Sequence, residues 1–244
     1  MKLTKKDVVV IIPVYKTSIS KTEETALLQV KAVLGAYKRV LVCPQSLDVR
    51  DYLSVDSELE TQRFPDYYFK NISGYNQLMM CPGFYKRFLT YKYMLIYQTD
   101  AWVFRDELLE WCEKGYDFIG APWVSIPASG KKTIFNLSTL LLGKVGNGGF
   151  CIRNIRKFYR NAILFRPISA LFPKNEDFFW CYIMPKLNPF FKIPTAELAL
   201  DFAFELDPEK CFERNGKHLP FGCHAWKKYN PQFWSSFIPA VPEA

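Results

Sequence analysis

The apolar pattern at the start of the chain changes from continuous to helical and back. Residues Val8 to Pro13 form an uninterrupted apolar run rich in β-branched side chains, which is typical of a strand buried on both faces. Ser20 and Glu23 form a Ser-x-x-Glu capping box, and apolar residues at helical spacing follow it. Arg39 to Cys43 is a second short strand-like run. This order predicts a βαβ unit, and therefore a parallel sheet with a right-handed crossover.

The middle of the chain continues the alternation. Gly74 to Phe88 has a helical pattern with a break at Pro82, and Tyr93 to Tyr97 is another buried strand. Asp106 is positioned to cap a short helix from Glu107 to Lys114, and Tyr116 to Gly120 predicts one more strand. Residues 44–73 are too polar to assign, and residues 124–145 indicate a loop with a short helix.

The last hundred residues are less regular. Gly146 to Gly149 precede a short strand at Phe150 to Ile152, and Asn154 can cap a helix that runs to Phe165. A helix is expected from Glu176 to Met184, stopped by Pro185, and the chain is expected to be rich in loops from Pro208 onward. The pattern as a whole predicts one α/β domain, residues 1–244, with a mostly parallel central sheet flanked by helices.

The composition excludes several classes. With 49% hydrophobic and 23% charged residues in 244, the chain can bury a full core, so global disorder is excluded. The 6 Trp, 14 Tyr and 21 Phe exceed what such a core needs, and they suit either sugar- or base-binding grooves or simply a rich core. The net charge of +8 favours anionic partners, but no zinc-finger spacing or RNA-binding motif indicates nucleic acid.

The cysteines and the first residues indicate a compartment. Seven cysteines without any CxxC, several inside apolar runs, argue against a disulfide framework or a zinc site and for a reducing environment. The start MKLTKKD leads directly into a strand too short to cross a bilayer. We therefore expect a cytoplasmic protein, with membrane contact limited to the surface of the inner leaflet.

Four features along the chain have the chemistry for a reaction centre. They are an aspartate directly after a buried strand (Asp100), the glycine run, the adjacent carboxylates Glu176 and Asp177 at a helix start, and a histidine near the C-terminus (His224). A carboxylate at the carboxyl end of a parallel strand can hold a divalent cation, and a buried carboxylate can act as a general base. Each feature also has an ordinary structural explanation. The acidic residues could cap helices, the glycines could form a tight turn, and the histidine could simply be packed in a loop.

The order of these features resembles that of the GT-A glycosyltransferase superfamily. There the corresponding elements are called the DxD motif, the G-loop, the xED motif and the C-terminal histidine, and the run VVVIIPVYK is similar to the first nucleotide-binding strand. The resemblance extends from Val8 to Trp226. It is nearest to a bacterial branch found among surface-polysaccharide genes, through the segments YQTDAWVF, YDFIGAPW, GNGGFCIR, NEDFFW and LPFGCHAW.

The resemblance implies a fold, an activity and roles for individual residues. It implies a single GT-A-like domain with a nucleotide-binding half of about residues 1–120 and an acceptor-side half of about 121–244. It implies transfer of a hexose from a nucleotide sugar, by default a UDP-sugar, to a hydroxyl of a glycan acceptor in bacterial capsule or surface-polysaccharide synthesis. The implied donor-site residues are Pro13, Val14, Tyr15, Gln98, Asp100, Gly148 and Gly149.

The implied chemistry uses a divalent cation, Mn²⁺ or Mg²⁺, bound by Asp100 and His224. Asp177, with Glu176 beside it, would be the catalytic base of an inverting transfer. The chain departs from the pattern at Gln98, which occupies the position of the first DxD carboxylate and brings no charge. Metal affinity should then be lower, unless spare carboxylates such as Asp117 and Glu176 compensate.

Two further features concern the acceptor. Trp123 and Trp226 are candidates to stack on acceptor sugars, with core packing as the equally plain alternative. A basic stripe at helical spacing and a basic, aromatic C-terminal tail suit either a solvated surface or contact with an anionic membrane and a lipid-pyrophosphate-linked acceptor. The stripe consists of Arg153, Arg156, Lys157 and Arg160.

Two other functions remain open. One is a retaining transferase or nucleotidyltransferase, which would share the metal aspartate and need no base at Asp177. The other is a non-catalytic carbohydrate-binding or scaffold protein of a polysaccharide assembly complex, which the missing carboxylate at Gln98 favours.

Overall fold

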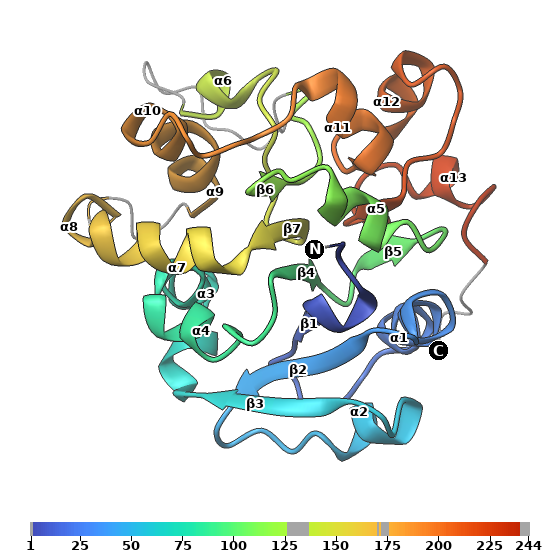
Figure 1. Cartoon of the computed structure of the whole chain (residues 1–244). Coiled ribbons are helices and arrows are strands. Elements are labelled where there is room, and N and C mark those ends of the chain that lie inside the picture. Colours follow the sequence, from blue (N-terminus) through green and yellow to red (C-terminus); the bar gives the residue numbers. More distant parts are fainter. Residues whose placement is uncertain (1, 126–136, 170, 172–175, 240–244) are drawn as a thin grey trace.

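A six-stranded, mostly parallel sheet forms the centre of the molecule (Figure 1). The computed structural model describes residues 2–125, 137–169, 171 and 176–239. The strand order is β3-β2-β1-β4-β7-β6, in which only β7 runs antiparallel to its neighbours. The strands are β1 (Val8–Pro13), β2 (Lys38–Pro44), β3 (Glu60–Phe64), β4 (Tyr93–Tyr97), β6 (Phe118–Ile119) and β7 (Phe150–Asn154). The α/β fold with a mostly parallel sheet is therefore confirmed.

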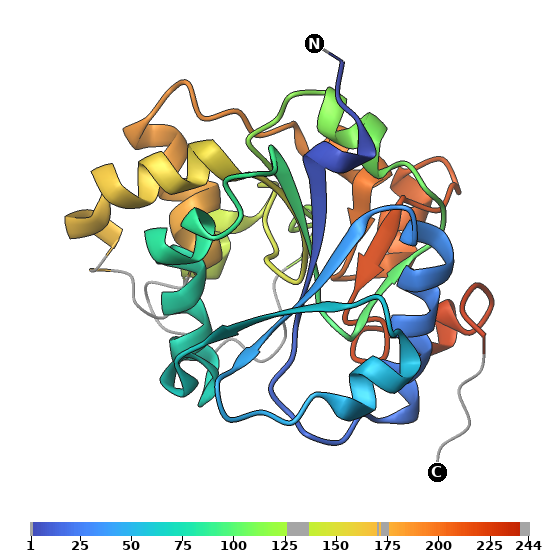
Figure 2. The ribbon, with the colours of Figure 1, turned by 60° about the horizontal axis from the view of Figure 1, so that its bottom comes forward.

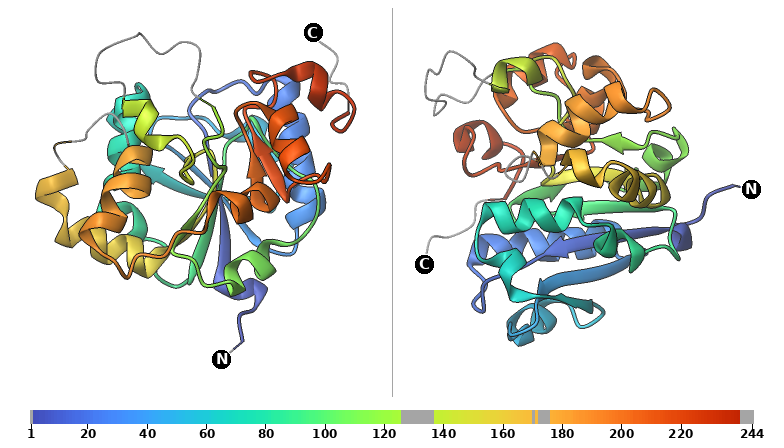
Figure 3. Two further views of the ribbon diagram at one scale, coloured as in Figure 1. Left: turned by 90° about the horizontal axis from the view of Figure 1, so that it is seen from above. Right: turned by 90° about the vertical axis from the view of Figure 1, so that its left-hand side faces the viewer.

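A second, three-stranded sheet has the order β5-β9-β8 and lies against α1 (Figure 3, left). It consists of β5 (Ala101–Val103), β8 (Ala203–Phe204) and β9 (Gly222–His224). It pairs β9 antiparallel to β5 and parallel to β8, so segments more than a hundred residues apart in the chain are brought together.

Helices cover both faces of the large sheet. Alternate residues of β1 point to opposite faces, so Val8, Val10 and Ile12 pack with α1 while Val9 and Ile11 pack with α3, α4 and α7. Figure 2 shows the sheet between α1 on one side and α3 and α4 on the other. The helices are α1 (Lys21–Leu34), α2 (Arg50–Val55), α3 (Ile72–Met80), α4 (Pro82–Lys86), α5 (Leu108–Glu113), α6 (Leu137–Leu141), α7 (Ile155–Leu164), α8 (Arg166–Ser169), α9 (Glu176–Phe178), α10 (Met184–Leu187), α11 (Ala196–Phe202), α12 (Pro208–Arg214) and α13 (Pro231–Trp234).

Several local predictions hold because the signals were local. The Ser20–Glu23 capping box forms as expected, with the Ser20 side chain accepting from Glu23 N. Asn154 caps α7 by accepting from Lys157 N at 3.2 Å. Pro82 separates α3 from α4. All seven cysteines are free thiols.

Other local predictions are wrong. Asp106 does not cap α5, because its carboxylate binds Lys5 Nζ and the Tyr37 hydroxyl instead. Pro185 does not stop the helix after Glu176: the chain passes through a π-helical segment, Phe179–Ile183, and Pro185 lies in the first turn of α10, where a missing N–H costs nothing.

The segments predicted to be irregular contain further structure. Residues 44–73 hold α2 and the polar edge strand β3, and the chain after residue 208 holds α12, β9 and α13. Edge strands and short capped helices have weak apolar periodicity, which is why the sequence did not reveal them. The predicted loop at 124–145 lies partly outside the described residues, which do include α6. No described helix has the length and apolar character needed to span a membrane.

Candidate active site

The candidate site lies at the carboxyl ends of β1 and β4. The strand order reverses between these two neighbours. β2 and β3 follow β1 toward one edge of the sheet, and β7 and β6 lie beyond β4 toward the other edge. Open α/β sheets bind ligands in the crevice at such a point. The loop after β4 carries Gln98, Thr99 and Asp100, and it is tied to the start of α1 by the bond from Thr99 Oγ1 to Glu23 Oε1 (3.3 Å).

The small sheet places His224 between two carboxylates. In the β5–β9 pairing Ala101 is opposite His224, and Asp100 is the residue before Ala101. In the β8–β9 pairing Phe204 is opposite Cys223, and Glu205 is the residue after Phe204. The two pairings therefore bring Asp100 and Glu205 next to His224 from the strands on either side of β9. His224 Nε2 lies 3.1 Å from Asp100 Oδ1 and 3.1 Å from Gln98 Oε1. Its other nitrogen, Nδ1, lies 3.0 Å from Glu205 Oε1.

The two carboxylates charge the imidazole. Burial alone would lower the pKa of His224, but the hydrogen bonds and charges of Asp100 and Glu205 outweigh it and raise the pKa to about 10. Burial likewise acts to raise the pKa of Asp100, and the contact with His224 overcomes this and lowers it. Without a bound cation, the histidine is therefore an imidazolium ion held by both carboxylates.

Asp100 and His224 are residue types that bind divalent cations. A cation would replace the proton that Asp100 Oδ1 and His224 Nε2 share across 3.1 Å and would take these two atoms as ligands. Glu205 binds the opposite ring nitrogen, as the carboxylate behind a metal-bound histidine commonly does. The described residues contain no group of three or more His, Cys, Asp or Glu arranged to hold a metal, so further ligands would have to come from the substrate.

The glycine run passes between the histidine and the two carboxylates of α9. A Cβ on Gly149 would lie 2.1 Å from His224 Nε2, and a Cβ on Gly148 would lie 2.2 Å from Glu176 Oε1. Asn147 turns the chain with a φ of 82° and accepts from Gly149 N at 2.8 Å. The glycines are thus required here because the backbone packs directly against the polar side chains of the site.

Glu176 is held by a buried arginine. Arg153 lies near the end of β7 (Phe150–Asn154) that is further from the site, and its fully buried side chain reaches back to within 3.3 Å of a Cβ placed on Gly148. It donates from one nitrogen to both oxygens of Glu176 (3.0 and 3.2 Å) and from another to the Tyr85 hydroxyl. Arg153 therefore does not belong to the basic stripe predicted on α7. Because its oxygens are engaged in this way, Glu176 is not a spare metal ligand.

Asp117 is not a spare ligand either. It precedes β6 at the opposite end of the sheet, where it accepts from Asn154 Nδ2 (3.0 Å) and Lys192 N (3.0 Å). Asn154 pairs with Tyr93, the first residue of β4, whereas the candidate site follows the last residue of that strand. The expected compensation by Asp117 for Gln98 is therefore wrong.

Asp177 has a buried carboxyl oxygen and a perturbed pKa. Its Oδ1 is buried and has no hydrogen-bond partner among the described residues. Burial raises the pKa of Asp177 well above its usual value, and the neighbouring charge of Glu176 raises it further against the pull of Arg153. An unpaired buried carboxyl with a raised pKa is costly to maintain, and such groups occur most often at functional sites.

The remaining predicted residues lie at varying distances from this centre. Pro13 and Val14 are buried at the end of β1, and Tyr15 after them is 62% exposed beside the candidate crevice. Trp123 is half-buried, its indole N–H lacks a described partner, and its ring touches the chain at Gly146. Trp226 packs edge-on against Trp102 in a buried cluster, which favours the packing role left open for it.

The sequence analysis missed three residues of the site: Glu205, Arg153 as a partner of Glu176, and Asn147. Glu205 follows a two-residue strand and has no motif around it, so only its pairing with His224 reveals it. Arg153 could have been suspected, since an arginine next to Ile152 in an otherwise apolar strand must find a buried partner.

The chain is similar to one family profile and to several solved structures. A profile described as Protein of unknown function (DUF5672) matches residues 58–224. No curated protein sequence matches the chain. An active-site mutant of LgtC aligns with a TM-score of 0.57 and 13% identity over 96% of this chain and 98% of that one, and LgtC is elsewhere described as a galactosyltransferase in complex with donor and acceptor sugar analogues.

A second structural relative is the glycosyltransferase GlyE from Streptococcus pneumoniae TIGR4. It aligns with a TM-score of 0.54 and 13% identity over 96% of this chain, which spans 61% of the GlyE chain. At these identities the likeness shows the fold alone. It confirms the GT-A architecture that the order of sequence motifs implied.

Proposed function

The chain belongs to the family described as Protein of unknown function (DUF5672), and we propose that it is a glycosyltransferase that moves a sugar from a UDP-sugar to a hydroxyl of a glycan acceptor. One observation carries the proposal. At the switch point of a GT-A sheet, the glycine turn brings the Asp100–His224 pair and Asp177, whose Oδ1 lacks a partner among the described residues, against the same few backbone atoms.

The donor end of the site is built from Asp100, His224 and Gln98. Asp100 and His224 would hold a divalent cation, which when bound neutralises the diphosphate of the nucleotide sugar. Asp100 can reach such a ligand because half of its side chain is exposed. Gln98 contributes an amide that can hydrogen-bond a phosphate or ribose oxygen, and Tyr15, after the end of β1, offers an exposed ring to the base.

Asp177 is the residue that we expect to act on the acceptor. We propose that it takes the proton from the attacking hydroxyl, which gives an inverting reaction. Its raised pKa makes it a stronger base than an ordinary aspartate once it is ionised. Arg153 fixes the start of α9 through Glu176 and therefore sets the position of the Asp177 carboxyl.

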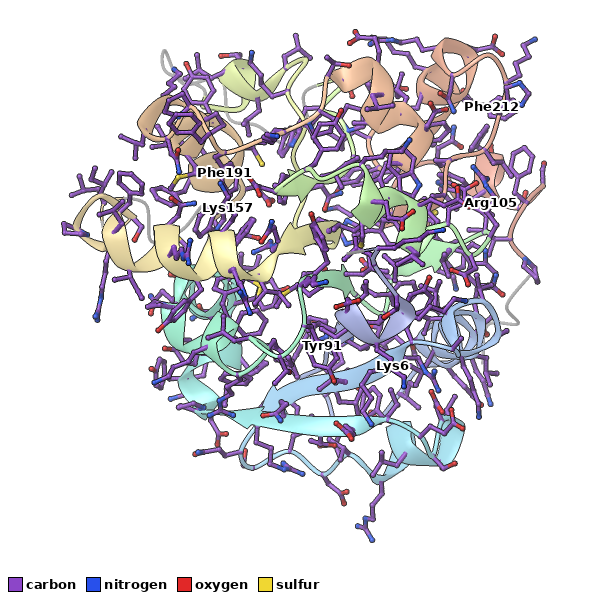
Figure 4. The ribbon with its side chains drawn as sticks, in the orientation of Figure 1. Lys6, Tyr91, Arg105, Lys157, Phe191 and Phe212 are labelled. Atoms are coloured by element: carbon purple, nitrogen blue, oxygen red, sulfur yellow. The ribbon has the colours of Figure 1, made fainter. Side chains whose placement is uncertain are left out.

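We also propose that the protein acts at an anionic membrane surface, on a glycan of the bacterial cell surface. The end of α7 exposes Ile163 and Leu164, and Leu171 after α8 is exposed as well. The sequence from 155 to 171 contains no acidic residue. Figure 4 shows Lys157 near Phe191, consistent with its Nζ lying 3.4 Å from Phe190 O, so the outward cations are Arg156, Arg160 and Arg166. Apolar side chains among cations suit a bilayer rich in anionic lipid.

A thermal-shift panel tests the donor site without knowledge of the sugar or the acceptor. UDP, GDP, CMP and CDP are each added with and without Mn²⁺, because a ligand that binds only the folded state raises the melting temperature by mass action. We expect stabilisation by UDP that Mn²⁺ enhances and that Asp100→Ala abolishes. Asp51→Ala, which removes an exposed carboxylate from α2, is the matched control and should behave as the wild type.

The other outcomes discriminate between the alternatives. A nucleotide response without Mn²⁺ dependence would retain the transferase and remove the cation. No response to any nucleotide would contradict the proposal and favour a carbohydrate-binding scaffold protein. A product whose anomeric configuration, determined by NMR, equals that of the donor would replace the inverting mechanism by a retaining one.

A further inference from the structure

A hollow of about 490 Å³ is lined in part by Gly143, Lys144 and Val145, which lead directly into the glycine turn of the candidate site. Its walls come from the loop Gly143–Val145, from the π-helical segment and α10, from the chain before α11, and from the end of α12. Figure 1 shows α10, α11 and α12 along the top of the molecule, away from β2 and β3 at the bottom. This volume is within the range of pockets that bind small organic molecules.

The chain from Gly143 to Gly149 connects the hollow to the reaction centre step by step. Gly143, Lys144 and Val145 line the hollow. A Cβ on Gly146 would lie 3.4 Å from Cys181 Sγ, at the wall of the hollow, and a Cβ on Gly148 would lie 3.1 Å from Asp177 Oδ1. Gly149 then packs against His224. Along this segment Asp177 therefore lies between the hollow and the Asp100–His224 pair.

The electrostatics of Cys181 show the same proximity. Burial raises the pKa of the Cys181 thiol, and the charge of Asp177 is the next largest cause. Cys181 and Asp177 are both contributed by the continuous helix that starts at Glu176. The wall of the hollow at Cys181 is therefore four residues along this helix from Asp177.

The hollow is lined by more positive than negative charge. Lys144, Lys186 and Arg214 face Glu197, and Glu197 is paired with Arg214 at 3.7 Å. Lys144 and Lys186 make no ion pair with any described residue, and Lys186 lies over the Tyr182 ring at 3.5 Å. The Tyr182 ring is stacked on Phe178, with centroids 5.0 Å apart, so it holds Lys186 in place at the hollow and does not itself present a free face to a sugar. Two ammonium groups without carboxylate partners offer an anionic sugar a site for its charge.

We propose that this hollow receives the acceptor and that the acceptor is an anionic glycan, with a carboxylate or phosphate group bound by Lys144 and Lys186. The inference rests on the proposed function, since it assigns the acceptor side of that same site. Donor and acceptor then approach Asp177 from opposite ends of the Gly143–Gly149 segment, as attack opposite to the leaving diphosphate requires.

Ligand-observed NMR titrations test this inference with three defined probes in the presence of EDTA. Methyl glucuronide carries a carboxylate, glucose 6-phosphate carries a phosphate, and methyl glucoside is neutral. We expect at least one anionic probe to bind about tenfold more tightly than the glucoside, and Lys144→Gln/Lys186→Gln to remove that difference. The two anions distinguish a carboxylated from a phosphorylated acceptor.

Lys6→Gln/Lys70→Gln is the matched control, since it removes the same charge from exposed positions outside the hollow and should bind like the wild type. Equal binding of all three probes, binding of none, or unchanged binding by Lys144→Gln/Lys186→Gln would overturn the inference. The UDP thermal shift is measured with Mn²⁺ on EDTA-free portions of the same protein preparations. Loss of the UDP response with anion binding intact would refute the proposed function and leave the hollow as an anionic-sugar site.

Discussion

At the scale of single residues, the site combines one unpaired acid with one histidine that is paired twice. Asp177 lacks a partner for Oδ1, whereas both ring nitrogens of His224 are occupied. The unpaired acid costs stability that a substrate hydrogen bond can recover, and the paired histidine is fixed in orientation before any ligand arrives.

Asp177→Asn should abolish transfer and leave the UDP-dependent thermal shift nearly intact. It should also change the pH dependence of stability. The folded pKa of Asp177 is raised, so above the ordinary value of about 3.9 the folded state holds a proton that the unfolded state releases, and stability falls as pH rises. The variant should lose this slope, as denaturation at several pH values would measure. Near-normal turnover would exclude Asp177 as the base, and Asp201→Asn, at an exposed position, is the control.

Glu205→Gln should weaken Mn²⁺ binding by about 10- to 100-fold, the usual effect of losing the carboxylate behind a metal-bound histidine. Titration of Mn²⁺ followed by electron paramagnetic resonance measures this without any turnover. Glu205→Asp should recover part of the affinity. Glu209→Gln, on an exposed position of α12, should bind as the wild type, and an unchanged affinity in Glu205→Gln would remove this role.

At the scale of elements, the turn from Gly146 to Gly149 determines the site more than any helix does. It carries the chain past Trp123, Glu176 and His224 with almost no space for side chains. The small sheet matters for a related reason, since three strands of two or three residues set the register of Asp100, Glu205 and His224.

Gly149→Ala tests the turn. The added methyl group would meet the imidazole of His224 at 2.1 Å, and such overpacking costs about 1–3 kcal/mol. We expect a lower urea midpoint and loss of Mn²⁺ binding together, because the imidazole must move. Gly83→Ala is the control: its Cβ meets only Cys81 Sγ at 3.4 Å, and alanine favours the helix α4. Wild-type Mn²⁺ affinity in Gly149→Ala would show that His224 need not move.

At the scale of the whole molecule, the distribution of charge gives the protein one face suited to a membrane. The surface formed by α7 and α8 is basic and partly apolar, and nothing in residues 155–171 opposes its charge.

Sedimentation with vesicles tests this face. The full chain should bind vesicles containing anionic lipid and not neutral ones, and binding should weaken with salt. Arg156→Glu/Arg160→Glu should reduce binding by more than tenfold, since each basic residue near such a surface contributes about 1 kcal/mol. Lys2→Glu/Lys6→Glu makes the same change of charge elsewhere and should bind better than the α7 variant. Equal loss in both variants would indicate only a general effect of net charge.

The sequence by itself determined the elements with strong local patterns and the order of the reactive residues. Continuous apolar runs specified β1 and β4, caps specified α1 and α7, and the carboxyl end of β4 fixed the place of Asp100. These features follow from burial and hydrogen bonding within a few residues, so they can be inferred without knowing the fold.

Only the tertiary structure decided how the polar groups pair. Glu205 meets His224 through a two-residue strand without periodicity, Arg153 leaves the expected basic stripe for Glu176, and Asp117 lies at the wrong end of the sheet. Buried charges take partners that strand register brings near, often from distant segments, and register depends on the packing of the whole chain. The sequence therefore identified which groups could react, and the fold determined which of them meet.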